Sequence, residues 1–488
     1  MHQLPILLFL PLLGALGVAF LPARWWTFVR PLALTASGGA LLLAWSLLRE
    51  FDGASASLQL VAHSVWRATI SGHFALGVDG FSLPMVLLGS LLCFVAMLAS
   101  AGIKERVRSY HVLMLLLEAG MLGVFLAQDW TLFYIFWELT LIPLFFLIER
   151  WGGANRHHAA LNFVLYTMGG SVFLLISLLL AFDAAPSGTF AMEEMAVALK
   201  TLPVKSQVLI FLGFLIGFGV KMPIFPLHGW LPLAHVEAPS PVSILLSGVL
   251  LKMGSYGLIR AAALLPGAVA ALQGLLAALA FISLLYGGLL AWRQTDLKRM
   301  IAYSSISHMG VVLAGIASLT AAGLTGAVMQ MVAHGLAAGS LFLLIGLLYH
   351  RTHTREVSDY SSLTEVAPRF AFFTILAFAA GVGMPGTAGF IAELHALVGG
   401  FQRWHGWAVL LSLGMLVGAA YSLRTIARLF TGPTRPEMRS IPDLRGVELA
   451  AAAALGAAIA ALGVVPAPAL GLIAASVERL TLTLSGHL

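Results

Sequence analysis

The most regular feature of the sequence is a succession of apolar runs of about 20 residues, separated by short polar stretches. Each run is long enough to cross the hydrocarbon core of a bilayer as a helix. The runs lie at 4–22, 28–48, 81–102, 110–127, 130–149, 160–182, 207–227, 240–262, 268–292, 300–318, 323–348, 369–397, 405–430 and 447–465. The pattern therefore predicts an all-α polytopic membrane protein with about 14 transmembrane helices.

Three stretches between or after these runs are not counted as spans. Residues 49–80 and 183–206 have the mixed polarity of amphipathic segments at a membrane surface, and the tail 467–488 favours a short interfacial helix. The composition supports the membrane assignment, because 60% of the 488 residues are hydrophobic and 10% are charged, against about 25% charged in soluble domains. The first run starts almost at Met1 without a preceding basic region, so we expect a retained helix and not a cleaved signal.

The basic residues indicate an orientation. With 14 spans and the N-terminus outside, the inward loops carry 18 of the 27 Lys and Arg residues and the outward side carries 7. This count places Lys298 in an inward loop and Arg260 on the outward side. The positive-inside rule then predicts that both termini lie on the outer, periplasmic side of a bacterial inner membrane. The net charge of +6 is spread over many loops, which does not indicate a nucleic-acid partner.

Two apolar runs contain the same broken motif. GVKMP at 219–223 recurs as GVGMP at 381–385, and prolines at 223, 226 and 385 remove helix hydrogen bonds. The offset of about five spans is odd, so the two copies would have opposite topology. Inverted repeats with helices broken near the midplane are typical of transporters.

Few ionisable residues lie inside the predicted spans, and most lie near the centre. Such residues are costly in a bilayer and usually mark an ion or proton pathway. They are Glu118, Glu138, Lys221, Lys252, His308, His334 and Glu393. At one depth they could form a row that relays protons, although static ion pairs for the charged residues, and helix-packing hydrogen bonds for the histidines, are the alternatives.

The lysines suggest how such a row could switch. Removal from water disfavours a charged lysine, and a nearby carboxylate restores the charge. We therefore pair Glu138 with Lys221 as a hypothesis, with Lys252 and Glu393 as the further ends of the relay.

Other chemistry is not indicated. The sequence contains no phosphate-binding loop, dinucleotide fingerprint or zinc-protease motif, so we expect no cofactor on this chain. Cys93 is the single cysteine, which excludes intramolecular disulfides. His228 and His235 are followed by Glu237 as the one further candidate ligand, and we expect no metal site there.

Several stretches resemble the antiporter-like membrane subunits of respiratory complex I, most closely the M-type (chain 4) branch. They are LGVDGFS (76–82), WELTLIPLFFLI (137–148), KMPIFPLHGWLP (221–232), LLKMGSYGLIR (250–260), DLKRMIAYSSISHMG (296–310), QMVAHGLAAGSLF (330–342) and PGTAGFIAE (385–393). Glu393, where the largest sibling subunit has a lysine, favours the M-type branch. The resemblance covers roughly residues 75–430.

The resemblance implies a specific fold. Residues 1–109 would hold three N-terminal helices, 110–262 a first repeat of helices 4–8, 268–430 an inverted second repeat of helices 9–13, and 431–488 helix 14 and the tail. Helices 7 and 12 would be broken.

The resemblance also implies an activity, namely proton translocation as part of an NADH:quinone oxidoreductase whose redox centres lie on other subunits. The family's functional positions fall on the seven residues named above. Partners would be sibling antiporter-like subunits, peripheral redox subunits and the lipid bilayer.

The sequence departs from the family pattern at two places, since Leu233 replaces the usual acid of GWLPDAH and His395 is an additional histidine. Related chains serve multisubunit Na⁺/H⁺ antiporters, membrane-bound hydrogenases and carbon-concentrating complexes, which are the alternative hosts.

Overall fold

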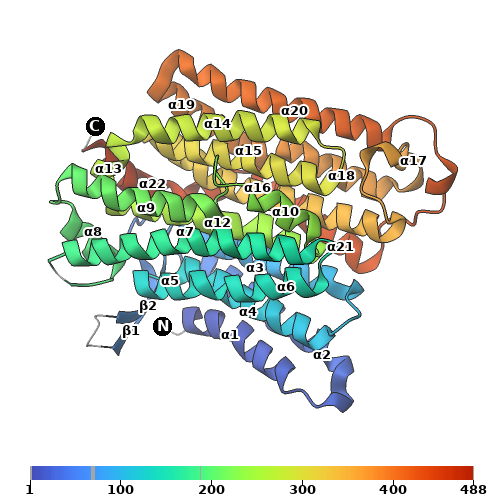
Figure 1. Cartoon of the computed structure of the whole chain (residues 1–488), viewed down its shortest axis with the longest axis horizontal. Helices are drawn as coiled ribbons and strands as arrows, with labels where there is room; N and C mark the ends of the chain where they lie inside the picture. The colour runs from blue at the N-terminus through green and yellow to red at the C-terminus, as the bar shows by residue number, and fades with distance from the viewer. Residues whose placement is uncertain (1–2, 68–71, 187, 487–488) are drawn as a thin grey trace.

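The computed structural model describes residues 3–67, 72–186 and 188–486. Residues 1 and 488, the outer limits of the division suggested above, lie outside this description. Within it, the long helices pack lengthwise against one another in one bundle (Figure 1). The first half contains α1 (Gln3–Ala19), α2 (Val29–Ser46), α3 (Ser82–Ala99), α4 (Val107–Leu126), α5 (Trp130–Leu139), α6 (Leu141–Trp151), α7 (Arg156–Ala184), α8 (Met192–Leu199), α9 (Val204–Lys221), α10 (Trp230–Glu237), α11 (Ser240–Leu245) and α12 (Leu251–Leu264).

The second half begins with the short α13 (Pro266–Ala271) and ends with a helix that follows the last predicted span. Its helices are α14 (Gln273–Arg293), α15 (Leu297–Ser318), α16 (Ala321–Thr352), α17 (Leu363–Val366), α18 (Pro368–Gly381), α19 (Ala388–Trp404), α20 (Val409–Phe430), α21 (Gly446–Val464) and α22 (Ala467–Ser485).

The helices match the predicted apolar runs. In the described residues, 13 helical stretches are long and apolar enough to cross a membrane, and one of them, Ala388–Phe430, holds both α19 and α20. α1 and α18 are apolar but shorter. A helix satisfies its backbone hydrogen bonds internally, which is what a lipid-embedded chain requires. The predicted all-α polytopic fold is confirmed.

Both predicted helix breaks are present. α9 ends at Lys221 and α10 begins at Trp230, while α18 ends at Gly381 and α19 begins at Ala388. The gaps hold the prolines of the GVKMP and GVGMP segments, whose missing N–H groups stop the helices. Two further irregularities were not predicted. Thr140 separates α5 from α6, and a π-helical turn, η5 (Leu246–Leu250), joins α11 to α12.

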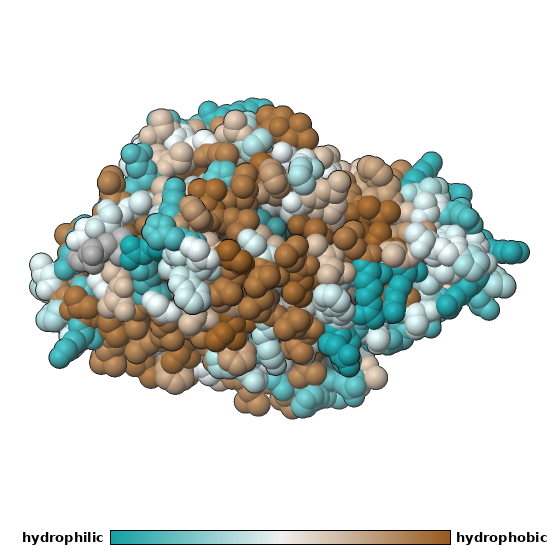
Figure 2. All heavy atoms as spheres, turned by 90° about the horizontal axis from the view of Figure 1, so that it is seen from above, coloured by the Kyte–Doolittle hydropathy of each residue, from teal (hydrophilic) through white to brown (hydrophobic). Residues whose placement is uncertain are grey.

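The interior of the bundle is formed by the helices that carry the central polar residues. The stretch Ser240–Leu264 is fully buried in its apolar window, and α15 and α16 are nearly so. α1 and α2 lie at one edge of the bundle and α20 lies at the opposite edge (Figure 1). On the face seen in Figure 2, hydrophobic residues fill the middle and hydrophilic residues gather toward the ends, as expected for a protein embedded in a bilayer.

The predicted surface segments lie together at one end of the bundle. The start of α1, the end of α22, α8, α13 and the hairpin all lie toward this end (Figure 1). Within 49–80 the chain forms an antiparallel hairpin of β1 (Gln59–Arg67) and β2 (Gly72–Val78), where an amphipathic segment was expected. Where a short interfacial helix was expected, the tail forms α22, a 19-residue helix that is long and apolar enough to cross a membrane. It buries one stripe of side chains against the bundle and contacts α12, α13 and α16.

Candidate functional site

Lys252 lies at the start of α12, directly after the π-helical turn, and its side chain is fully buried. Its Nζ donates hydrogen bonds to the carbonyl oxygen of Ser247, at 2.5 Å, and to Nδ1 of His334 on α16, at 2.6 Å. A π-turn displaces carbonyl groups from the regular helical pattern, and such turns occur often at functional sites. Here the turn places a backbone acceptor against the ammonium group, and the lysine joins α12 to α16.

His308 on α15 continues the row from His334. Their ring centroids are 5.2 Å apart. Nδ1 of His308 lies 2.8 Å from the carbonyl oxygen of Ser304, and Nε2 lies 2.8 Å from the carbonyl oxygen of Gly381. A carbonyl oxygen accepts but does not donate, so both contacts are hydrogen bonds when both ring nitrogens carry protons. Both ring nitrogens of His308 thus face carbonyl acceptors, and Gly381 supplies one of them because α18 ends there.

A small cavity lies between the two histidines and the end of α18. Its volume is about 20 Å³, which is enough for one water molecule. Ser304, His308, Gln330, His334 and Gly381 line it. Nε2 of His334 and Oε1 of Gln330 are buried and have no hydrogen-bond partner within the described part of the chain. Several polar groups that could hold a water molecule thus face one space.

Lys221 is the last residue of α9 and is buried, with 2% of its surface exposed. Its Nζ donates to Oγ1 of Thr140, at 3.1 Å, and lies 4.6 Å from the centroid of the Trp137 ring. The lysine segments are adjacent, because Gly254 of α12 packs against the backbone of Met222 beside Lys221. The break between α9 and α10 and the irregular stretch from α11 to α12 therefore form one region.

Glu138 was paired with Lys221 as a hypothesis, and the structure places it between the two residues that Lys221 contacts, Trp137 and Thr140. The five ion pairs among the described residues do not include Glu138 with Lys221. Oε1 of Glu138 is buried and has no hydrogen-bond partner in the described ranges. The two groups are neighbours, but Thr140 is the direct partner of Lys221.

Glu118 on α4 faces a different helix. It is fully buried, and its Oε1 accepts a hydrogen bond from Ser37 of α2, at 3.0 Å. Gly120, two residues further along α4, packs against Thr140 at the interruption of helix 5. The structure therefore brings α4 to the Lys221 region through Gly120, whereas the Glu118 carboxylate contacts α2.

Glu393 on α19 is 8% exposed and reaches back to the break between α18 and α19, where its carboxylate packs against Gly383. No described side chain forms a hydrogen bond or an ion pair with it. The break thus touches His308 through Gly381 and Glu393 through Gly383. Of the seven predicted residues, Lys252, His334 and His308 form one continuous row, and Glu393 lies at its end.

Two buried basic residues were not predicted as part of this interior. His235 is fully buried on α10 and stacks on Phe342 of α16, with ring centroids 4.6 Å apart. Lys298 is 4% exposed, and its Nζ donates to the carbonyl oxygen of Ala238 at 2.8 Å. Lys298 therefore lies in the first turn of α15 and not in a loop, while the inward side stays a prediction. It lies two residues before the predicted span 300–318, a difference within the error of span boundaries read from hydropathy.

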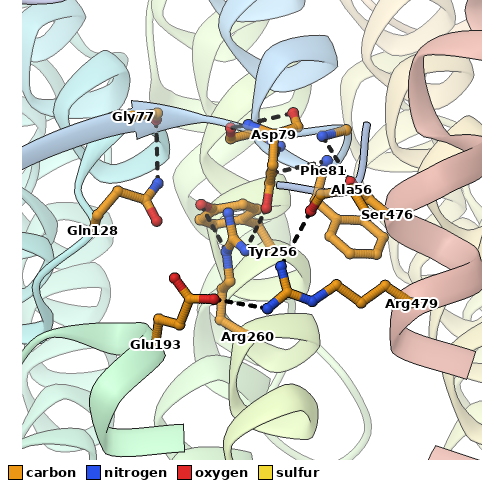
Figure 3. A network of polar contacts seen from close by, with 12 residues as sticks. Ala56, Gly77, Asp79, Phe81, Gln128, Glu193, Tyr256, Arg260, Ser476 and Arg479 are labelled. Carbon is orange, nitrogen blue, oxygen red and sulfur yellow. Dashed lines mark hydrogen bonds and ion pairs between the residues drawn. The ribbon is translucent and has the colours of Figure 1, made fainter. Parts of the chain in front are cut away.

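Arg260, which was counted on the outward side, is largely buried and forms an ion pair with Asp79, at 2.6 Å (Figure 3). Tyr256 accepts a further hydrogen bond from Nε of Arg260, at 2.9 Å. Burial raises the pKa of the Asp79 carboxyl, but Arg260 and the backbone N–H groups of Phe81 and Ser82 outweigh it and hold the pKa below its usual range. The sequence did offer a signal for this ion pair. Asp79 lies in LGVDGFS and Arg260 in LLKMGSYGLIR, two of the stretches that carry the family resemblance.

The same network fastens the last helix to the bundle (Figure 3). Ser476 of α22 accepts a hydrogen bond from the backbone N–H of Gly80, at 3.0 Å. Arg479, one turn further, pairs with Glu193 of α8 at 2.7 Å. The end of α22 is thus tied to the start of α3 and to the surface helix α8.

The two departures from the family pattern lie apart from the row. Leu233 is partly buried on α10 and packs against the core. Nδ1 of His395 donates to the carbonyl oxygen of Ile391 within α19, at 2.7 Å. In the described ranges, no three His, Cys, Asp or Glu side chains gather closely enough to hold a metal ion.

Comparison with known proteins supports the resemblance of the motifs. A family model described as NADH:quinone oxidoreductase/Mrp antiporter, transmembrane, matches residues 127–418. NAD(P)H-quinone oxidoreductase chain 4 2 of Thermosynechococcus vestitus is 40% identical over 481 residues, which cover 95% of this chain and 89% of that protein. Chain 4-3 of Nostoc sp. is 42% identical over 399 residues, which cover 81% of this chain and 71% of that protein.

The fold agrees with solved structures. A chain of respiratory complex I from Thermus thermophilus superposes with a TM-score of 0.90 and 32% identity, covering 99% of each chain. A chain of the Mrp complex from Dietzia sp. has a TM-score of 0.85 and 21% identity, covering 100% of each chain, a likeness of fold alone. The chain therefore belongs to the NADH:quinone oxidoreductase/Mrp antiporter transmembrane family, as an antiporter-like subunit of the complex I chain 4 type.

Proposed function

We propose that this chain translocates protons across the membrane as a membrane-arm subunit of a complex I-type NAD(P)H–quinone oxidoreductase. The relatives that match it over most of their length carry that enzyme's name. Quinone reduction on other subunits would supply the energy, and sibling antiporter-like subunits would be its neighbours. This chain would carry no redox centre. The bilayer would be a bacterial energy-converting membrane, either the cytoplasmic membrane or a thylakoid, with both termini on the outer or lumenal side.

The observation that carries the proposal is the buried row from Lys252 through His334 to His308. Lys252 donates directly to His334, and the free Nε2 of His334 faces the same small cavity as His308. Each of these groups can hold and release a proton, and one water molecule in the cavity would complete the connection. Titratable groups at the centre of a membrane bundle are energetically costly, and they usually mark an ion or proton pathway.

Glu138 and Lys221 would form the switch at the other end. In this structure Lys221 donates to Thr140, and Glu138 is a neighbour without an ion pair. Approach of the carboxylate would favour the charged lysine, and its withdrawal would release a proton toward Lys252. Glu393 would act as the far gate. Glu118, which contacts Ser37, would tune the first half from the α2 side.

The broken helices fit the proposed division into inverted repeats at 110–262 and 268–430. Lys221 lies at the break between α9 and α10, and the break between α18 and α19 contacts Glu393. Broken helices expose backbone groups that can take part in ion sites, provided that they are covered by protein.

The decisive experiment compares two lysines of the same helix. In membrane vesicles that contain the whole complex, Lys221→Ala should abolish NADH-driven proton translocation while the complex still assembles. Lys205→Ala, which changes the exposed start of α9, should leave translocation unchanged. Normal proton translocation by an assembled Lys221→Ala complex would contradict the proposal. An obligatory requirement for Na⁺ would instead favour a cation/proton antiporter.

A further inference from the structure

The two helix breaks, between α9 and α10 and between α18 and α19, differ at the position where the first has Lys221. In GVKMP the helix α9 continues through Lys221, and the lysine side chain is buried. In GVGMP the equivalent position is Gly383, which lies just after the end of α18 with φ +70°. This left-handed conformation favours glycine, because a β-carbon there is sterically strained. The second break therefore has no side chain where the first has its lysine.

The space left by Gly383 is occupied by Glu393. A β-carbon built on Gly383 would lie 3.0 Å from the carboxyl carbon of Glu393 and would overlap its Oε2. Glu393 itself is 8% exposed and comes from the second turn of α19. The carboxylate thus lies against the bare backbone of the break, in the volume that a side chain at residue 383 would take.

The same break also holds His308. The carbonyl oxygen of Gly381, two residues before Gly383, faces Nε2 of His308 at 2.8 Å. One short irregular segment therefore contacts both the last histidine of the row and the terminal carboxylate. Its conformation determines how close the two groups lie.

We propose that Gly383 is a positioning residue whose missing side chain creates the seat for the Glu393 carboxylate, next to the carbonyl group that His308 contacts. This inference rests on the proposed function, in which Glu393 receives or releases the translocated proton. A side chain at residue 383 displaces the carboxylate from the break. This position thus requires glycine for two reasons, namely the left-handed backbone conformation and the space that the Glu393 carboxylate occupies.

The test uses the assembled complex in vesicles and measures NADH-driven proton translocation. Gly383→Ala should slow translocation by ~10- to 100-fold, the size of effect expected when a reacting group is displaced by about 1 Å. Gly386→Ala is the matched control, since Gly386 is in the same break with φ +88° but has no atom within 4 Å of an added β-carbon. It shares the backbone strain without the overlap and should retain most of the activity.

A double variant distinguishes loss of the space for the Glu393 carboxylate from a general disturbance of the break. Glu393→Asp shortens the side chain by one methylene group, so Gly383→Ala/Glu393→Asp should recover toward the rate of Glu393→Asp alone. If Gly383→Ala does not assemble, recovery of assembly in the double variant supports the seat. Equal losses in Gly383→Ala and Gly386→Ala, or no rescue by the shorter acid, would overturn the inference. Normal translocation by Glu393→Gln would refute the role of Glu393 itself, and with it the need for a seat.

Discussion

Replacing Arg260 by methionine should destabilise the folded chain by about 3–5 kcal/mol, because it leaves a buried carboxylate without its cation. Asp79 loses the ion pair at 2.6 Å, and Tyr256 loses the hydrogen bond from Nε at 2.9 Å. The side chains of Arg260 and Asp79 are 15% and 12% exposed. This limited access to water places the expected loss toward the lower end of that range.

The loss should depend on pH in a defined direction. In the native chain the pKa of Asp79 is lowered, so the pair contributes stability above the ordinary carboxyl pKa of 3.8 and loses it as the pH falls through the folded value. In Arg260→Met, burial remains as the main influence and favours the neutral acid. The destabilisation should therefore be largest near neutral pH and should shrink as the pH is lowered.

This effect is measured by thermal unfolding of the purified complex in detergent. A fluorescent reporter on this chain monitors its unfolding. Asp79→Leu/Arg260→Met, which removes both charges, should recover much of the loss, since a buried ion pair can often be replaced by apolar groups. A single Arg260→Met variant as stable as the native chain at pH 7 would refute the reasoning. A double variant less stable than both single variants would do the same.

Three further predictions follow from contacts of the site and the end of the bundle. Thr140→Val keeps the side-chain shape but removes the acceptor of Lys221, so proton translocation should slow while assembly, checked by native gel electrophoresis, stays normal. His334→Leu breaks the link to Lys252 and should stop translocation in the same vesicle assay, with no effect on electron transfer to an artificial acceptor. Arg479→Ala should not change the melting temperature measurably, because its ion pair with Glu193 is exposed and such pairs contribute at most about 1 kcal/mol.

Hydropathy and proline placement predicted the helices and the breaks, since both follow from the bilayer as solvent and from the chemistry of single residues. They did not predict which way a helix faces. Glu118 and Gly120 are two residues apart on α4, yet the carboxylate contacts Ser37 and the glycine packs against Thr140. The rotation of α4 is set by packing with several neighbours, and periodicity in a uniformly apolar run carries little information about it.

The sequence also did not indicate the irregular backbone that holds Lys252. The π-helical turn at Leu246–Leu250 contains no proline that would have marked it in the sequence. The lysine itself was predicted from its depth in the span. Its partners depend on how α11 and α12 fit against α15 and α16, which is a property of the packed bundle.

The hydrogen bond from Gly80 to Ser476 has a consequence for biogenesis. The two residues are 396 positions apart in the chain. At translation rates of about 5–20 residues per second, the start of α3 emerges roughly 20–80 s before its partner on α22 exists. The loop around Asp79 therefore remains uncapped while all later helices enter the membrane, and α22 closes it last. This contact would be a natural marker that synthesis has passed α22, because a chain interrupted before α22 still lacks it.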